Sequence, residues 1–106
     1  MAKKSSIKIR SKRLHDGIQI RTLIAHPMEN GRNLDQLNGE LIPAHFIQEI
    51  TVKHNDRVII SGNLGGGIAK DPFFTFLLKE AQSGDKITIS WLDNQQLSDS
   101  KDHFIK

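Results

Sequence analysis

The sequence predicts an all-β protein, an antiparallel β-sandwich of about seven strands. Apolar residues alternate with polar residues in several short stretches, which is the pattern of half-buried strands. Glycine, asparagine and aspartate separate these stretches at intervals of about 8–12 residues, the spacing typical of a sandwich. No long stretch shows the spacing of an amphipathic helix. Together these observations favour an immunoglobulin-like sandwich.

The chain of 106 residues has the size and composition of one globular domain. Domains typically contain about 50–250 residues. Its 37% hydrophobic and 25% charged residues are an ordinary globular mixture. We therefore expect residues 1–106 to form a single domain with its own core.

The first quarter of the chain predicts two strands joined by a tight turn. Ile7 and Ile9 alternate with basic residues, and Asp16-Gly17 supplies the turn. One face of the second strand is then formed by alternate residues, namely Ile18, Ile20, Thr22 and Ile24. Pro27 ends this strand, because proline has no N–H to donate to a sheet.

The rest of the chain predicts further short strands separated by turns. A loop over residues 28–41 precedes a strand with one apolar face, formed by Phe46, Ile50 and Val52. The later turns are Asn55-Asp56, the glycine-rich residues 62–67 and Ser83-Gly84-Asp85, and the later strands are residues 58–61, 73–78 and 87–91. The chain from Asp93 onwards is polar, and only Phe104-Ile105 is expected to pair.

The composition excludes several classes of protein. The chain has no cysteine, so it has no disulfide, thiolate metal site, iron–sulfur cluster or cysteine nucleophile. No apolar run approaches the ~20 residues that a membrane-spanning helix needs. The first residues are not followed by the apolar segment of a secretory signal. We expect a protein without a membrane partner.

The formal net charge of +3 arises largely near the N-terminus. Six basic residues precede the first acidic residue, Asp16, namely Lys3, Lys4, Lys8, Arg10, Lys12 and Arg13. A nucleic-acid-binding surface usually combines such residues with aromatic side chains, and this segment contains none. We therefore expect a solvated strand face and no nucleic-acid partner.

Two of the five histidines, His26 and His45, flank the long loop and are expected to approach each other. A metal site needs three or four ligands with supporting hydrogen bonds. The other histidines lie beside turns or near the C-terminus, at His15, His54 and His103. We expect hydrogen-bonded histidines, with no metal and no cofactor.

No catalytic motif is present in the sequence. Gly65, Gly66 and Gly67 do not match the glycine patterns of phosphate-binding loops. The acidic residues are scattered, and no spacing suggests a serine, histidine and aspartate triad. The residues by themselves therefore predict a non-catalytic β-domain that binds a partner.

Four segments of the chain resemble the SoxZ family. They read Leu-Ile-Ala-His-Pro-Met-Glu-Asn-Gly at 23–31, Leu-Ile-Pro-Ala-His-Phe-Ile at 41–47, Gly-Gly-Ile-Ala-Lys-Asp-Pro-Phe-Phe-Thr-Phe at 66–76 and Gly-Asp-Lys-Ile-Thr-Ile-Ser-Trp-Leu-Asp-Asn at 84–94. The chain differs from the family pattern at residues 64–69, which usually resemble Trp-Gly-Pro-Gly-Ile-Ser. It also has Gln95-Gln96 where the family tends to have a glycine.

The resemblance implies a non-catalytic, immunoglobulin-like subunit that pairs with the SoxY subunit in a heterodimer or larger complex. In that family, SoxY carries sulfur intermediates covalently on a cysteine of a flexible, glycine-rich C-terminal arm. Enzymes of the thiosulfate-oxidation system act on that arm. The absence of cysteine from this chain is consistent with this role, because a second thiol near the arm would exchange with a persulfide carried there.

The resemblance also implies a cellular location and a set of partner-binding residues. Family members are exported to the periplasm with the partner, without a signal peptide of their own. The expected partner-binding residues lie around the long loop, at His26, Pro27, Met28, Pro43, His45 and Phe46, and in the glycine segment, at Gly65, Gly66 and Gly67. An alternative is that Met28 and Phe46 pack the loop onto the sandwich. An exposed partner face also favours a homodimer of the isolated chain.

One alternative function belongs to a different class. Immunoglobulin-like domains with histidines at strand ends also resemble the iron site of superoxide reductases, which would make His26, His45 and His54 ligands. That site needs a cysteine as its axial ligand, and this chain has none.

Overall fold

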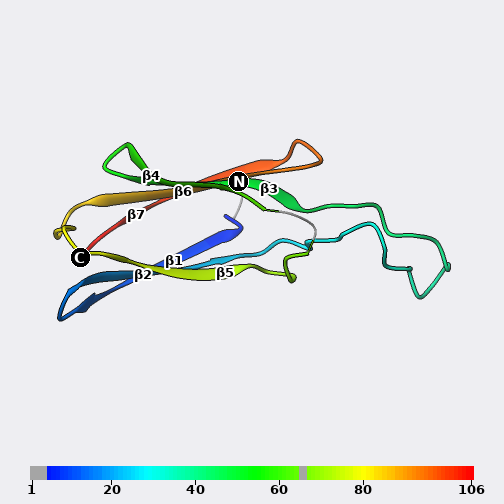
Figure 1. Cartoon of the computed structure of the whole chain (residues 1–106), viewed down its shortest axis with the longest axis horizontal. Helices are drawn as coiled ribbons and strands as arrows, with labels where there is room; N and C mark the ends of the chain where they lie inside the picture. Colours follow the sequence, from blue (N-terminus) through cyan, green and yellow to red (C-terminus); the bar gives the residue numbers. More distant parts are fainter. Residues whose placement is uncertain (1–4, 65–66) are drawn as a thin grey trace.

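Two antiparallel sheets packed face to face form the protein (Figure 1). The computed structural model describes residues 5–64 and 67–106. The strands are β1 (Ile7–Leu14), β2 (Gly17–Ile24), β3 (Ile47–His54), β4 (Arg57–Asn63), β5 (Phe73–Leu78), β6 (Lys86–Asp93) and β7 (Ser98–Phe104). One sheet has the order β1-β2-β5 and the other the order β4-β3-β6-β7. The predicted all-β sandwich is confirmed. The described residues contain no helix, and so none that could cross a membrane.

The hairpin of β1 and β2 presents the apolar face that the sequence predicts. Its buried residues are Ile7, Ile9, Ile18, Ile20 and Ile24, each exposed by 8% or less. At the start of β2, a Cβ atom on Gly17 would lie 2.7 Å from the carbonyl oxygen of Leu78 in β5. Only glycine therefore allows β5 to lie this close to the turn.

A β-bulge shapes the pairing of β3 with β4 after the predicted Asn55-Asp56 turn. Val52 pairs with Ile60, whereas the next residue of β3 pairs with Val58. Ile59 is therefore an extra residue of β4, and extra residues turn the side chains beside them. As a result, Ile59 and Ile60 both line hollows between the two sheets.

The predicted apolar face of β3 is wrong at its beginning. A register shift between Ile47 and Glu49 interrupts the alternation in the pairing with β6. Ile47 is consequently fully buried, while Phe46, predicted to share the face of Ile50, precedes the strand and is half-buried. Alternation in one segment cannot reveal a bulge, because the extra residue exists only relative to the neighbouring strand.

The prediction for the C-terminal segment is also wrong, because β7 pairs along its whole length with β6. Its inward-facing residues include Asp99 and His103, which contact serines near and on β1 and do not enter the apolar core. Without apolar alternation, the sequence carries no signal for this strand. Phe104 is exposed, and the following Ile105 is the residue that enters the core.

The core lies between the sheets and consists mainly of isoleucine. Its buried members are Ile7, Ile9, Ile18, Ile20, Ile24, Met28, Ile47, Ile50, Val52, Ile87, Ile89, Trp91 and Ile105. Polar contacts close the sandwich where β1 meets β7. Ser6 donates from its backbone N–H and its hydroxyl to Asp99 Oδ2, at 2.8 and 2.7 Å, and Trp91 Nε1–H donates to the same hydroxyl at 3.1 Å.

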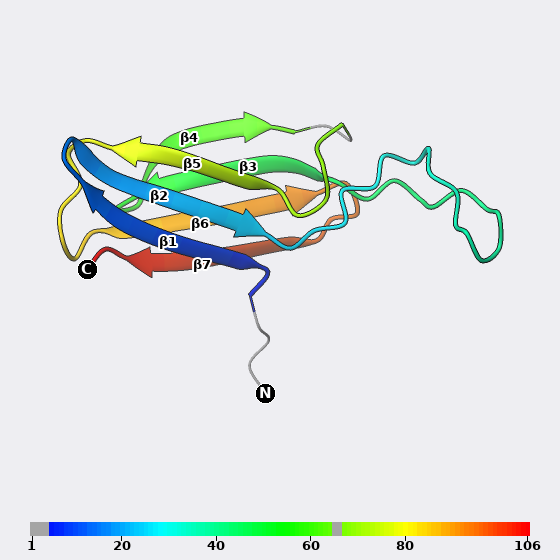
Figure 2. The ribbon, with the colours of Figure 1, turned by 90° about the horizontal axis from the view of Figure 1, so that it is seen from below.

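In the described part of the chain, the opposite side of the sandwich is not closed by polar contacts. In a constant-type immunoglobulin domain the fourth strand lies beside the fifth in one sheet. Here β4 pairs with β3, so β4 and β5 are end strands of different sheets and lie on the same side of the molecule (Figure 2). Among the described residues, neither strand has a partner on its outer edge. We call this side of the sandwich the open edge.

The core contains a buried hydroxyl whose removal should stabilise the fold. Thr22 is fully buried, and its Oγ1 has no hydrogen-bond partner among the described residues. We expect Thr22→Val to raise the free energy of unfolding by about 1 kcal/mol, because valine keeps the shape and removes an unpaired polar group. Urea unfolding followed by the fluorescence of Trp91 measures this change.

Thr88→Val is the matched control. Thr88 Oγ1 donates to Asp102 Oδ1 at 2.7 Å on the outer face, so its loss should not stabilise the protein. A Thr22→Val protein less stable than the wild type would show that the hydroxyl has a partner in solution.

Candidate functional site

An arm formed by residues 25–46 projects from one end of the sandwich (Figures 1 and 2). Its two limbs are bridged near the base at Glu29 and His45 and further out at Leu34 and Leu41. Leu34, Leu37 and Leu41 are 60%, 98% and 62% exposed. The arm therefore presents apolar side chains that its own fold does not cover.

The buried carboxylate of Asp93, at the end of β6, joins both limbs at the base of the arm. Asp93 Oδ2 accepts hydrogen bonds from Nε2 of His26 at 3.1 Å and from Nε2 of His45 at 2.7 Å. Asp93 Oδ1 accepts from the backbone N–H groups of Gln95 at 3.0 Å and Leu97 at 2.9 Å. The carboxylate has four donors and is 0% exposed.

The tautomer of His26 follows from its second hydrogen bond. Its Nδ1 accepts from the backbone N–H of Met28 at 3.1 Å, so the proton of a neutral ring lies on Nε2. That proton is donated to Asp93. The ring is 3% exposed and meets Trp91 edge-on at a centroid distance of 5.1 Å. His26 is thus a fixed part of the interior.

The charge of Asp93 is stabilised in place. Burial alone disfavours the ionised form. The hydrogen bonds from His26, Leu97, His45 and Gln95 outweigh that effect and hold the pKa of Asp93 below its ordinary value. The arm is therefore anchored to a carboxylate that stays ionised at neutral pH.

The four segments that resemble the SoxZ family all reach this anchor. Asp71 donates its backbone N–H to the carbonyl of His26 and accepts from the N–H of His26, both at 2.9 Å. Asn94 holds the returning limb, because its Oδ1 accepts from the N–H of Phe46 at 2.7 Å and its Nδ2 donates to the carbonyl of Ala44 at 2.9 Å. Segments far apart in the sequence thus build one structural joint.

The predicted partner-binding residues around the loop differ in exposure. His26 and Met28 are buried, at 3% and 5%. His45 and Phe46 are half-buried. Two prolines, Pro27 and Pro43, are exposed. Of the glycine segment, Gly67 is exposed, and a Cβ atom there would meet nothing within 4 Å. Gly65 and Gly66 lie outside the described residues.

The ligand set of the iron-binding alternative is not assembled. His26, His45 and Asp93 offer ligand atoms within 4.8 Å of one another. His54 lies at the far end of β3, where its Nε2 is 2.8 Å from Asp85 Oδ2. An imidazole that ligates through Nε2 carries its proton on Nδ1, but Nδ1 of His26 faces the N–H of Met28. The hydrogen bonds of this cluster therefore do not fit a metal.

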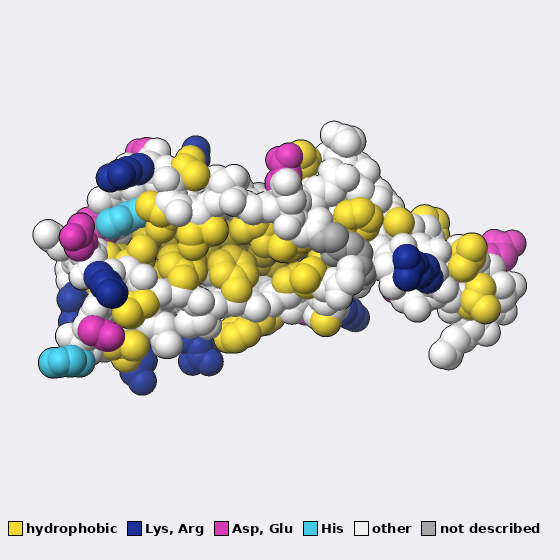
Figure 3. All heavy atoms as spheres, viewed as in Figure 1, with side chains coloured by type: hydrophobic (Ala, Val, Ile, Leu, Met, Phe, Trp, Pro, Cys, Tyr) yellow, Lys and Arg dark blue, Asp and Glu magenta, His cyan; other side chains and the backbone are white. Residues whose placement is uncertain are grey.

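An apolar cavity opens along the open edge between β4 and β5. It has a volume of about 370 Å³ and is lined by Ile50, Ile60, Gly62, Leu64, Ile68, Pro72, Phe73, Phe74, Thr75 and Phe76. Farther along the same edge, Ile59 and Leu77 line a second hollow of about 480 Å³. Figure 3 shows hydrophobic side chains gathered in a band between the two sheets on this side.

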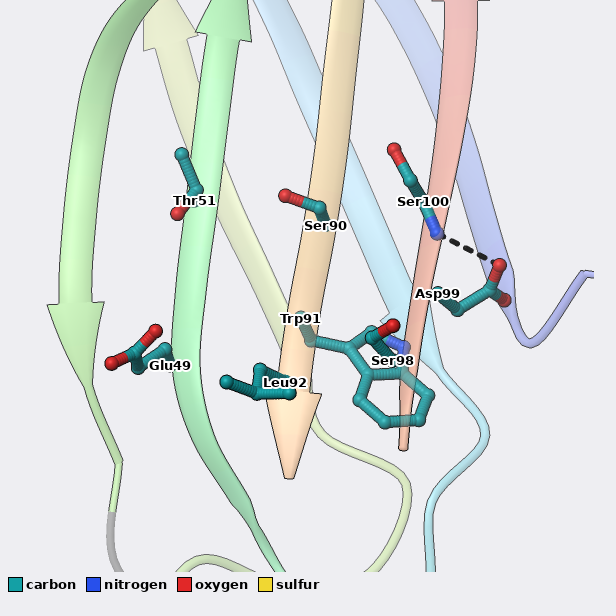
Figure 4. Close-up of a pocket in the computed structure, with 8 residues that line it drawn as sticks. All are labelled: Glu49, Thr51, Ser90, Trp91, Leu92, Ser98, Asp99 and Ser100. Atoms are coloured by element: carbon teal, nitrogen blue, oxygen red, sulfur yellow. Dashed lines mark hydrogen bonds between the residues drawn. The ribbon is translucent and has the colours of Figure 1, made fainter. Parts of the chain in front are cut away.

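The outer face of the four-stranded sheet carries a shallow polar hollow of about 320 Å³ (Figure 4). Thr51, Ser90 and Ser100 lie side by side on neighbouring strands, in register across β3, β6 and β7. Two carboxylates line the hollow, but Asp99 is hydrogen-bonded to Ser5 and Ser6 near β1, and Glu49 lies on β3, which β6 separates from β7. This surface lacks the paired groups of an acid–base site.

Comparison with protein families matches residues 7–103 of the chain to the family described as sulphur oxidation protein SoxZ. The matched region runs from the first residue of β1 nearly to the end of β7. None of the curated proteins compared with the chain matches it.

Sequence reasoning did not identify Asp93 or the open edge. A signal for Asp93 exists, because it continues the alternation of Ile87, Ile89 and Trp91 and so faces the core. The open edge has no comparable signal, since it depends on which strand β4 pairs with.

Substitution of Asp93 should destabilise the protein strongly. In Asp93→Asn, the amide nitrogen would face N–H donors in either orientation. These are His26, which cannot change tautomer while the N–H of Met28 occupies Nδ1, or the backbone N–H groups of Gln95 and Leu97. We expect the free energy of unfolding to fall by about 3 kcal/mol at neutral pH. Asp16→Asn, at an exposed position, is the control for loss of one negative charge.

The same variant should show a different pH dependence. Because the folded pKa of Asp93 is lowered, its contribution is complete above the unfolded pKa of about 4 and is lost as the pH falls through the folded value. Wild-type stability should therefore fall more steeply below about pH 4 than that of Asp93→Asn. Parallel acid-unfolding curves would contradict this assignment.

Metal addition should leave the protein unchanged. Both ring nitrogens of His26 are used in hydrogen bonds, so Zn²⁺ or Fe²⁺ should not raise the midpoint of thermal unfolding. A rise that saturates at equimolar metal and disappears in His45→Gln would overturn this prediction. Elemental analysis of the purified chain provides a second measurement.

Proposed function

Because the chain belongs to the SoxZ family of sulfur-oxidation proteins, we propose that it is the non-catalytic subunit of a sulfur-carrier complex and binds SoxY. In this complex, a cysteine on the C-terminal arm of SoxY carries the sulfur intermediates covalently while the enzymes of thiosulfate oxidation act on them. The present chain supplies a binding surface and no reacting group.

The proposal that the chain binds SoxY rests chiefly on the apolar side chains exposed at the open edge. Ile59, Ile60, Ile68, Phe73 and Leu77 expose between 37% and 58% of their surface along it. These fractions correspond to roughly 400 Å² of apolar surface, within the range of patches that are often functional. A standard interface buries about 800 Å² on each side, somewhat more than half of it apolar. The open edge supplies most of that apolar share.

Two unpaired strand edges strengthen this proposal. An outer strand edge offers N–H and C=O groups that another chain can pair with. β4 and β5 both present such edges, and apolar side chains fill the space between them. A protein partner could pair with the backbone groups and also cover the apolar side chains, because it can contribute a strand and apolar side chains together. In the absence of SoxY, the same edge is available to a second copy of the chain.

The assignment of a non-catalytic role rests on the chemistry of this chain. It contains no cysteine, so a thiol that carries sulfur must belong to the partner. The candidate acid–base cluster, Asp93 with His26 and His45, has its carboxylate fully occupied by four hydrogen bonds. We further propose, from the family resemblance, that the chain acts in the periplasm and is exported together with SoxY.

Co-expression with SoxY tests the proposal directly. Size-exclusion chromatography should give a stable complex of the two chains. Intact mass measurement should then find any sulfur adduct on SoxY and none on this chain. If the chain elutes alone at micromolar concentrations of both proteins, it does not have this function.

Substitutions on β4 test whether the open edge is the interface. Ile60 lines the cavity, whereas Val58 is 52% exposed and absent from both hollows along the edge. We expect Ile60→Asp to weaken SoxY binding by about tenfold or more, because it places a charge among apolar side chains. Val58→Asp is the matched control on the same strand and should bind within about twofold of the wild type. Leu37→Asp, at the tip of the arm, tests separately whether the arm contributes to binding. Greater loss from Leu37→Asp than from Ile60→Asp would assign the interface to the arm.

A further inference from the structure

The outer face of the three-stranded sheet concentrates positive charge that the protein itself does not neutralise. Lys8, Arg10 and Lys12 point outwards from β1, and Arg21 points outwards from β2. We call this surface the basic face. None of these residues forms an ion pair within residues 5–64 and 67–106. The remaining residues of the chain contain no acidic side chain.

The arrangement of two arginines on this face is unfavourable for the fold itself. Arg10 and Arg21 are directly opposite each other in the pairing of β1 with β2. Like charges in directly opposed positions destabilise a sheet. The outward positions of the three strands include no carboxylate that could offset this repulsion. An anionic partner would offset this repulsion, because both arginines would attract it.

Apolar side chains border the basic face. Leu23 and Phe73 are direct neighbours across β2 and β5 and are 40% and 58% exposed. The guanidinium of Arg21 lies 5.9 Å from the centre of the Phe73 ring. Together with Lys8 and Arg10 these side chains line a hollow of about 310 Å³. The surface therefore combines cations with apolar contact area.

We propose that the basic face binds an acidic polypeptide segment that also carries apolar side chains. Along β1 the three cations recur at every second residue, about 7 Å apart. An extended peptide with a carboxylate at every second residue repeats at the same distance. Leu23 and Phe73 then contact its apolar side chains. Nucleic acid matches this surface less well, because interfaces with nucleic acid are polar and the described residues of the basic face include a single aromatic ring for stacking.

Binding of a short fluorescent peptide to the purified chain tests this proposal without SoxY. The probe is Glu-Thr-Glu-Thr-Glu-Thr-Phe, which has a carboxylate at every second residue and an apolar end, and the control peptide replaces its three glutamates with glutamine. We expect the glutamate peptide to bind at low salt, to weaken as salt is added, and to bind more tightly than the glutamine peptide. Equal binding of the two peptides, or no binding at low salt, would overturn the proposal.

Variants identify the surface. Arg10→Gln combined with Arg21→Gln should weaken peptide binding about three- to tenfold. The control Arg32→Gln with Lys101→Gln removes the same charge from exposed positions elsewhere and should have no comparable effect. An equal loss of affinity in both variants would show that binding depends only on net charge, and would overturn the assignment to the basic face. A DNA duplex that binds more tightly than the peptide, with the same variant dependence, would overturn it in favour of nucleic acid.

Stability provides a second readout. Removal of the opposed arginines should leave the midpoint of thermal unfolding unchanged or raise it, because it relieves repulsion. A protein that loses binding and keeps its stability separates recognition from folding. A lower midpoint would show that the arginines stabilise the sheet and would contradict the argument.

Discussion

The structure depends on one buried carboxylate at the point where the arm leaves the sandwich. Asp93 ends β6 and receives hydrogen bonds from histidines on both limbs of the arm. A buried charge is tolerated only when its hydrogen-bonding capacity is filled, and here four donors fill it. The position of each limb is consequently fixed relative to the four-stranded sheet.

This joint explains why the most distinctive sequence motifs lie where they do. His26 and Met28 look like surface residues in a loop, yet both are buried. Met28 has a φ of 50°, donates its N–H to His26, and accepts from the N–H of Ile47 through its sulfur at 3.3 Å. These side chains therefore fix the placement of the arm, and the leucines further out on the arm remain exposed.

The two sides of the sandwich are closed in different ways, and this asymmetry organises the surface. Where β1 meets β7, serines, Trp91 and Asp99 form a polar seal. Burial opposes the charge of Asp99, and the hydrogen bonds from Ser6 lower its pKa below the ordinary value. Between β4 and β5 the interior reaches the surface as an apolar cavity. The side between β4 and β5 therefore exposes apolar surface, whereas the side where β1 meets β7 is closed by hydrogen bonds.

The sequence alone determined the strands whose residues alternate, because a strand that faces one core must alternate apolar and polar residues. Ile18, Ile20 and Ile24, and likewise Ile87 and Ile89, are buried as predicted. The sequence also predicted that His26 and His45 approach each other, and their rings lie 4.6 Å apart. The class of fold and the family follow from these local patterns and motifs.

Only the tertiary structure decided the features that depend on pairing between strands. The bulge that buries Ile47 in place of Phe46 exists only relative to β6. β7 has no apolar alternation, and Asp99 and His103 on its inward side contact serines and not the core. The open edge arises because β4 joins β3 and leaves β5 uncovered. The basic segment near the N-terminus contains no aromatic residue, and only the sheet brings Phe73 of β5 into one hollow with Lys8 and Arg10. Each of these contacts joins residues far apart in the chain, and no pattern within one segment records them.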